Sequence, residues 1–115
     1  MGRFIGFCLA LLFSAGCGPD APIYEVENLS PNALIIDVRT PSEYTSGHID
    51  KAINIPYDVI GFKINAVTSE KDREVLLYCQ SGRRSGIALK TLKDLGYRNA
   101  KNAGGYDALR KKLGQ

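Results

Sequence analysis

The sequence has 115 residues, a net charge of +3 and 44% hydrophobic residues, which are ordinary values for a globular protein. This length fits one small domain. The apolar content excludes an intrinsically disordered chain. Because basic residues form no block except at residues 110–112, nucleic-acid binding is not expected.

The N-terminal segment has the layout of a secretory signal. A positive charge near the start is followed by an apolar run at residues 4–13 and then by small residues up to Cys17. The run is too short to span a membrane. We therefore expect residues 1–16 to be a signal peptide, residues 17–22 a tether and residues 23–115 the folded domain of an exported, periplasmic protein.

Two processing routes are open at Cys17. Small residues before a cysteine resemble the bacterial lipoprotein box, in which the cysteine is lipidated and anchors the protein to a membrane. Ser14 departs from that box, which usually has leucine there. Ordinary signal cleavage near Ala15 or Gly16 would instead give a soluble periplasmic protein with an unmodified Cys17. Either route removes Cys8 and leaves Cys79 as the one cysteine inside the fold, so no disulfide framework is expected.

The first part of the domain predicts two strands. Residues 23–26 predict a short edge strand, and the apolar run that ends at Asp37-Val38-Arg39 predicts a buried parallel strand. Asp37 and Arg39 point to the same face of that strand. We expect them to form an ion pair or cap that fixes the following turn. Contact with the substrate or with a catalytic loop is the alternative.

A short helix with Thr40 as its N-cap is expected next. Glu43 completes a capping box, and the helix ends by Gly47. His48 is the single histidine and precedes a strand-like segment at residues 53–56, so a loop-fixing hydrogen bond is favoured over a role as a general base. One histidine and one internal cysteine cannot complete a metal site, and no metal is expected.

Two longer helices are predicted from apolar residues that recur at helical spacing. The first begins at Tyr57-Asp58, and the second runs over residues 83–95. We expect each to bury one apolar stripe. The stripes are Ile60, Ile64 and Val67 in the first helix and Ala88, Leu92 and Leu95 in the second.

The C-terminal part of the chain returns to the sheet and ends in a helix. Gly96 is expected to end the preceding helix as a left-handed cap. Residues 97–102 then predict a short strand, Gly104-Gly105 a tight turn and residues 106–113 the last helix.

The chemistry-bearing stretch begins at Cys79, directly after a short apolar run at residues 75–78 that fits a buried parallel strand. The cysteine therefore lies at the carboxyl end of the sheet, where α/β folds place their sites. The backbone N–H groups that follow can curl around the sulfur, and a helix N-terminus behind them favours anions and the thiolate. Gly82 permits a positive φ. The residues expected to bind an anionic substrate are Gln80, Ser81, Gly82, Arg83, Arg84 and Ser85.

Several short motifs lie in a fixed order between Leu34 and Leu113. They are Asp37-Val38-Arg39, Glu43-Tyr44, Gly47-His48-Ile49, Ala52-Ile53-Asn54-Ile55-Pro56, Cys79-Gln80-Ser81-Gly82-Arg83-Arg84-Ser85 and Asn102-Ala103-Gly104-Gly105-Tyr106. Together they resemble the rhodanese (thiosulfate sulfurtransferase) domain. With an export signal and a single short domain, the chain looks most like the phage shock protein E type of periplasmic rhodanese. The family usually has glycine before the Ala-Ile-Asn segment, whereas in this chain Asp50-Lys51 precedes Ala52.

The resemblance implies an α/β fold, a single domain with a central parallel sheet of about five strands flanked by helices on both faces. It also implies a two-step sulfur transfer, in which Cys79 attacks the outer sulfur of thiosulfate, releases sulfite and holds a persulfide for a thiophilic acceptor such as cyanide or a thiol. Arg84 carries over as the arginine that closes the loop, and Arg83 as an aid to specificity. We expect no cofactor and a monomer.

Two other functions remain open. A phosphatase or arsenate reductase of the related fold would have one more loop residue than the six from Cys79 to Arg84 in this chain. Alternatively, the domain could carry persulfide to a protein partner, or only bind one.

Overall fold

The computed structural model describes residues 28–115. The expected signal peptide, tether, edge strand at residues 23–26 and lipidation site at Cys17 all lie outside these residues. None of the helices in the described range has both the length and the apolar character that a membrane span requires.

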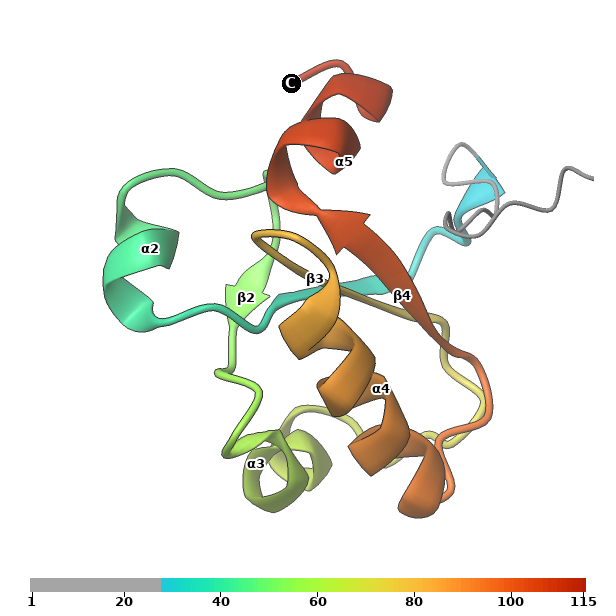
Figure 1. Cartoon of the computed structure of the whole chain (residues 1–115). Coiled ribbons are helices and arrows are strands. Elements are labelled where there is room, and N and C mark those ends of the chain that lie inside the picture. The colour runs from blue at the N-terminus through green and yellow to red at the C-terminus, as the bar shows by residue number, and fades with distance from the viewer. Residues whose placement is uncertain (1–27) are drawn as a thin grey trace, which may run out of the picture.

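Four parallel strands form one sheet in the described part of the chain, in the order β2-β1-β3-β4 (Figure 1). The α/β architecture with a parallel sheet is thus confirmed. The count is lower than the expected five, because the remaining candidate strand falls at residues 23–26. The strands are β1 (Leu34–Asp37), β2 (Ile53–Asn54), β3 (Val75–Cys79) and β4 (Ala100–Gly105).

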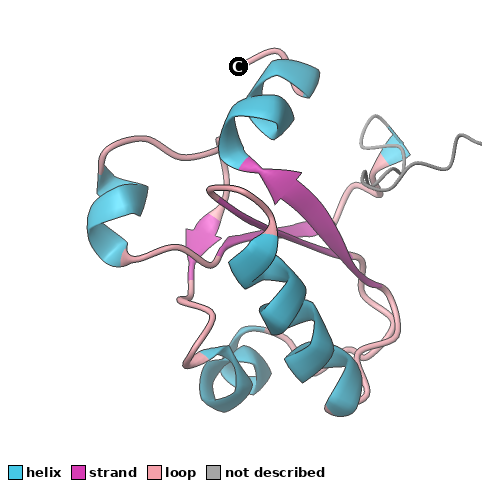
Figure 2. Cartoon of the chain, in the orientation of Figure 1, coloured by secondary structure: helices cyan, strands magenta, loops and turns pink. Residues whose placement is uncertain are grey.

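Helices cover both faces of the sheet (Figure 2). On one face lie α3 (Ile60–Val67) and α4 (Arg83–Asp94), and on the other lie α2 (Pro41–Thr45) and α5 (Tyr106–Lys112). Covering both faces explains why β1 and β3 are nearly continuous apolar runs.

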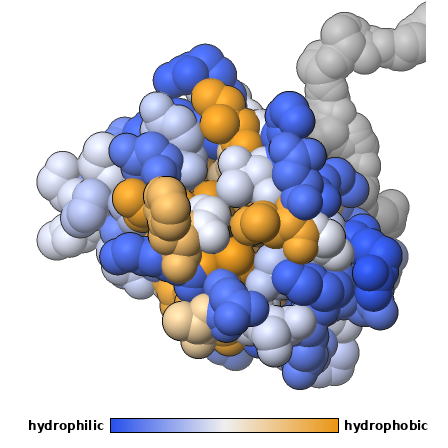
Figure 3. Space-filling view, turned by 90° about the horizontal axis from the view of Figure 1, so that it is seen from below, coloured by the Kyte–Doolittle hydropathy of each residue, from blue (hydrophilic) through white to orange (hydrophobic). Residues whose placement is uncertain are grey.

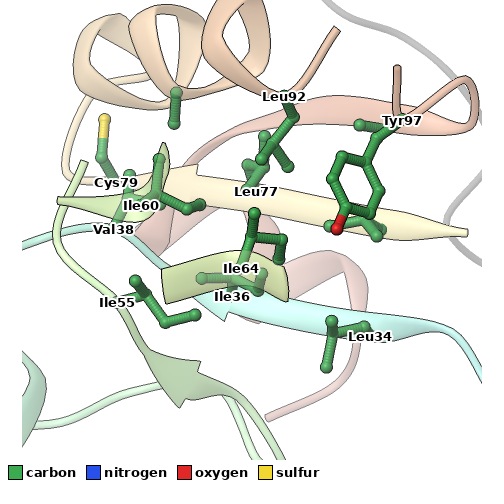
Figure 4. Close-up of a cluster of buried hydrophobic side chains, with 13 residues drawn as sticks. Leu34, Ile36, Val38, Ile55, Ile60, Ile64, Leu77, Cys79, Leu92 and Tyr97 are labelled. Carbon is green, nitrogen blue, oxygen red and sulfur yellow. The ribbon is translucent and has the colours of Figure 1, made fainter. Parts of the chain in front are cut away.

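The larger apolar cluster lies between the sheet and the helices α3 and α4. Alternate residues of β3 point into it, namely Val75, Leu77 and Cys79. Figure 4 shows Cys79 at one end of this cluster, with Leu34 and Tyr97 toward the other. The sulfur therefore lies where the aliphatic core meets the carboxyl ends of the strands.

Two residues of the expected apolar stripes are not buried. Val67 is 38% exposed and Leu95 is 44% exposed, so the prediction that they belong to the core is wrong. Both lie at the C-terminal ends of their helices, since Val67 is the last residue of α3 and Leu95 follows the last residue of α4. Buried Tyr97 fills the end of the core instead. Figure 3 shows the molecule from below the view of Figure 1, where apolar patches lie among hydrophilic ones.

The last strand begins later and ends later than expected. Residues 98 and 99 form a turn, and β4 runs through both glycines of the predicted tight turn. Gly104 has a φ of 87° and lies at a register irregularity beside Tyr78, while Gly105 still pairs with Cys79. A bulge of this kind uses the left-handed conformation that glycine adopts without strain. The two glycines therefore extend the sheet to the tip of β3.

Lys51 takes the place of the glycine that the resemblance led us to expect. Its φ is 71°, the only positive φ among the described residues that are not glycine. The Ala52 N–H donates to the Ile49 carbonyl across this turn at 3.0 Å. The chain keeps a turn suited to glycine at a conformational cost of about 1–2 kcal/mol.

Candidate active site

The loop between β3 and α4 folds over the sulfur of Cys79. Gly82 has a φ of 97° and is the N-cap residue of α4. This left-handed conformation turns its N–H toward Cys79 Sγ at 2.9 Å. The Ser85 hydroxyl lies 3.6 Å from the same sulfur. The backbone conformation at Gly82 thus aims a main-chain donor at the thiol.

These donors change the acidity of the thiol. Burial of Cys79 raises its pKa, but hydrogen bonds from the Ser85 hydroxyl and from the backbone N–H groups of Ser85, Ser81 and Gly82 lower it. The lowering effects prevail, so the pKa lies below the ordinary value for cysteine. The site therefore stabilises the thiolate of Cys79 more than an exposed cysteine would be stabilised in water.

The sulfur of Cys79 is fully buried and also accepts hydrogen bonds from backbone N–H groups of the loop. Cys79 is 0% exposed, whereas Gln80, Ser81 and Arg83 above it are exposed. A reagent reaches the sulfur only by displacing or passing between the loop residues. Burial in an apolar cluster would suit an inert thiol, but the inward amides distinguish this site from one.

The two loop arginines have different surroundings. Arg84 forms a two-point ion pair with Glu43 of α2, Nη1 to Oε1 at 2.9 Å and Nη2 to Oε2 at 3.1 Å. This pairing holds the pKa of Glu43 down at about 2, with a further contribution from the N–H of Thr40. Arg83 is exposed and has no ion-pair partner among residues 28–115. Arg83 is thus the loop cation left open to a ligand.

Asp37 and Arg39 form a buried ion pair at 2.7 Å beneath the loop. Arg39 Nη1 also donates to Gln80 Oε1 at 3.2 Å, and its Nη2 donates to the Gly47 carbonyl at 2.7 Å. The bond with Asp37 raises the pKa of Arg39 despite burial. The pair thus combines the structural role predicted from the sequence with a direct contact to the active loop through Gln80.

Aromatic residues complete this network. The Tyr78 hydroxyl donates to Asp37 Oδ2 at 2.8 Å and accepts from the Ile49 N–H at 3.0 Å. Burial is the main reason that the pKa of Tyr78 is raised, and the bond to Asp37 adds to it. The Arg39 guanidinium lies 4.5 Å from the ring centre of Tyr106. These tyrosines are not among the site residues expected from the sequence, although the alternation of β3 places Tyr78 on the opposite face of the strand from Cys79.

Asn102 of β4 is a further site residue that the sequence analysis missed. Its Oδ1 accepts from the Ser85 hydroxyl at 2.7 Å, and its Nδ2 donates to the Gly82 carbonyl at 3.0 Å. The signal that could have revealed it is its place in the motif before the paired glycines. Asn102 therefore links the last strand to the loop that holds the sulfur.

His48 makes its contacts away from the sulfur. Its Nδ1 lies 2.9 Å from the Tyr44 carbonyl oxygen, and its ring stacks on that of Tyr44 at 3.7 Å. Residues 28–115 contain no group of three or more metal-ligating side chains of the His, Cys, Asp and Glu types. The polar groups around Cys79 are thus hydroxyls, amides and arginines.

Comparison with known proteins gives a consistent result. A rhodanese-like domain profile matches residues 24–112. The thiosulfate sulfurtransferase PspE of Escherichia coli K12 is 37% identical over 97 residues, covering 84% of this chain and 82% of that protein. The thiosulfate:glutathione sulfurtransferase of Saccharomyces cerevisiae is 38% identical over 80 residues, covering 60% of this chain and 58% of that protein.

A solved structure agrees with the sequence matches. An Escherichia coli rhodanese determined with anions superposes with a TM-score of 0.63 at 39% identity, covering 65% of this chain and 88% of that one. The chain belongs to the rhodanese-like domain family.

Proposed function

We propose that this protein is a sulfurtransferase that takes the outer sulfur of thiosulfate on Cys79 and passes it to a thiophilic acceptor. Family membership supports sulfur transfer in general. The thiosulfate donor is supported by the names of the Escherichia coli and yeast relatives. The yeast relative's name also supports a thiol as acceptor.

In the first step, the Cys79 thiolate attacks the outer sulfur of thiosulfate. The new S–S bond forms as the bond to the sulfite sulfur breaks, and sulfite leaves with the electron pair of that bond. The enzyme then holds a persulfide anion, Cys79–S–S⁻. In the second step, cyanide or a thiolate attacks the terminal sulfur, the S–S bond to Cys79 breaks, and the thiolate returns with its electron pair. No oxidant or metal is consumed.

The hydrogen bond from the Gly82 N–H to Cys79 Sγ, at 2.9 Å, is the observation that carries this proposal. It shows that the loop directs main-chain donors inward. Inward donors stabilise an anion on sulfur both before and after the first step. Because these hydrogen bonds lower the pKa of the Cys79 thiol, we expect the first step to proceed without a general base. Exposed Arg83 supplies a positive charge for an anionic donor.

The test compares the full chain with its Cys79→Ser variant. We expect thiocyanate formation from thiosulfate and cyanide by the parent alone. Intact mass after incubation with thiosulfate is expected to show one added sulfur atom in the parent and none in the variant. Equal turnover by the two proteins would remove Cys79 from the mechanism.

Two further measurements separate the competing functions. Hydrolysis of p-nitrophenyl phosphate by the parent would favour a phosphatase over a sulfurtransferase. A parent that gains the sulfur atom but transfers it to neither cyanide nor small thiols would favour a persulfide carrier for a protein partner.

We also propose that the protein is exported, with residues 1–16 removed. The support is the charge, apolar run and small residues of the N-terminal sequence. Labelled palmitate incorporation by the parent and its loss in Cys17→Ser would assign the lipid-anchored form. A processed but unlabelled parent would assign the soluble periplasmic form.

A further inference from the structure

The Ser85 hydroxyl has one proton and three acceptors within reach. Its Oγ lies 2.7 Å from Asn102 Oδ1, 3.1 Å from the Gly82 carbonyl oxygen and 3.6 Å from Cys79 Sγ. Ser85 and Cys79 are both buried, so neither is in contact with solvent. The shortest contact is the strongest site for a single proton. While the sulfur is a neutral thiol, the hydroxyl therefore donates to Asn102.

The partners of Asn102 fix which end of its amide faces Ser85. Asn102 Nδ2 donates to the Gly82 carbonyl at 3.0 Å, and Asn102 Oδ1 accepts from the Gly104 N–H at 2.9 Å. Exchanging the two ends would place donor against donor and acceptor against acceptor. The carbonyl oxygen is thus held toward Ser85. It competes with Cys79 Sγ for the hydroxyl proton.

We propose that Asn102 is a positioning residue that draws the Ser85 hydroxyl away from Cys79 in the thiol form and yields it to the sulfur in the anionic form. An anionic sulfur is a stronger acceptor than a neutral amide oxygen, so rotation of the hydroxyl follows ionisation. Only hydrogen bonds are exchanged. The Asn102 amide then keeps the Gly104 N–H as a donor to Oδ1, so no buried polar group is left without a partner.

The consequence is that Asn102 sets how readily Cys79 ionises, although it does not touch the sulfur. Its relevance to sulfur transfer rests on the proposed function, in which the anion of Cys79 is the reacting species. The experiment that tests it measures the protonation of Cys79 and not the rate of sulfur transfer. A protein that fails the thiosulfate assay can therefore still pass this test, and the two failures are distinguishable.

The experiment is a double-mutant cycle on the full chain. It uses the parent, Ser85→Ala, Asn102→Ala and the double variant. The pKa of Cys79 is obtained from the pH dependence of alkylation by iodoacetamide. Mass spectrometry of the Cys79 peptide excludes contributions from Cys8 and Cys17.

Two effects of Asn102→Ala have to be separated. It removes the competing acceptor, which favours the thiolate only when Ser85 is present. It also removes the hydrogen bond from Asn102 Nδ2 to the Gly82 carbonyl, which loosens the loop in both backgrounds. The quantity compared is the change that Asn102→Ala causes in the thiolate-to-thiol ratio of Cys79 at fixed pH. We expect this change to favour the thiolate about threefold more when residue 85 is serine than when it is alanine.

Equal changes in both backgrounds would mean that Asn102 only supports the loop, and would overturn the proposal. A coupling of opposite sign would mean that Asn102 helps Ser85 to donate to sulfur, and would also overturn it. Asn102→Asp provides a second cycle should Asn102→Ala not fold. Aspartate is a stronger acceptor than asparagine, so we expect Asn102→Asp to shift Cys79 toward the thiol. This shift should be larger with Ser85 than in the Ser85→Ala background, and an equal or smaller shift with Ser85 would contradict the proposal.

Discussion

The face of the sheet beneath α3 and α4 is aliphatic, whereas the face beneath α2 and α5 buries an ion pair. On the first face, alternate residues of β1 and β3 pack with the helices around Ile36 and Leu77. On the second, Asp37, Arg39 and Tyr78 share a hydrogen-bonded network within a smaller apolar cluster. The same two strands supply both faces, because successive side chains point in opposite directions.

The difference shows that the active loop is held in two ways. The aliphatic face anchors α4, whose N-terminus follows the loop directly, and non-directional packing tolerates small changes of volume. The polar face reaches the loop through the Arg39 to Gln80 hydrogen bond, which depends on charge and direction. We therefore expect the polar face to be the more sensitive to conservative substitution.

The largest effect is expected for Asp37→Asn. This change keeps the shape of the side chain but leaves the guanidinium of Arg39, only 4% exposed, without a counter-charge. Breaking a buried ion pair in this way costs about 3–5 kcal/mol in the free energy of unfolding. Urea denaturation followed by circular dichroism measures it.

Ile36→Val is the matched control for Asp37→Asn. It alters the adjacent residue of β1 on the aliphatic face and removes one methylene group from a fully buried side chain. We expect a loss of about 0.5–1.5 kcal/mol. A loss as large as that of Asp37→Asn would contradict the distinction between the two faces.

An intermediate effect is expected for Gly105→Ala at the tip of β4, where both faces meet the loop. A Cβ at this position would lie 2.6 Å from the Gln80 carbonyl oxygen, so the loop has to move. Overpacking of this kind costs about 1–3 kcal/mol in stability. We expect the rate of thiocyanate formation to fall about tenfold or more, because small misplacements of reacting groups are costly.

Gly104→Ala separates steric displacement from backbone strain. A Cβ there meets nothing within 4 Å, but φ is 87°. We expect a stability loss of about 1–2 kcal/mol from the left-handed conformation and a smaller loss of activity than in Gly105→Ala. The reverse order of activities would show that strain, and not the approach to Gln80, limits the loop.

The features that follow from local sequence were predictable. The capping box of Thr40 and Glu43 is confirmed by the Thr40 N–H to Glu43 Oε1 bond at 2.9 Å and the Glu43 N–H to Thr40 Oγ1 bond at 3.2 Å. The positive φ of Gly82 is confirmed as well. Both depend on residues close in the chain. The resemblance to the rhodanese domain added the expectation of a parallel sheet flanked by helices, but not the order of its strands.

The features that depend on distant residues were not predictable from spacing. Glu43 meets Arg84 across 41 positions, and Asn102 meets Ser85 across 17. The residues next to Glu43 in the sequence predict its role in the capping box, but they do not indicate that it also pairs with a distant arginine. The conformation of Gly104 and Gly105 also depends on a distant segment. A pair of glycines is compatible with either a tight turn or a bulge, and the pairing of β4 with β3 determines that a bulge forms.

The smallest effect is expected for Glu43→Gln, which tests the polar contact at the rim of the loop. Glutamine keeps the capping box but loses the ion pair with Arg84. The carboxyl has a pKa of about 2 in the folded protein, lowered first by Arg84 and then by the Thr40 N–H. Its side chain is 33% exposed, so solvent screening reduces the contribution to about 1 kcal/mol at neutral pH.

The pH dependence gives the sign of this contribution. An unfolded glutamate titrates near 4.3. The folded pKa is lower, so the stabilising effect is complete above about pH 5 and is lost as the pH falls toward 2. We therefore expect the parent and Glu43→Gln to differ in unfolding free energy at pH 7 and to converge near pH 2. A difference independent of pH over this range would mean that the charge of Glu43 does not contribute to stability, and would contradict the expected role of its ion pair with Arg84.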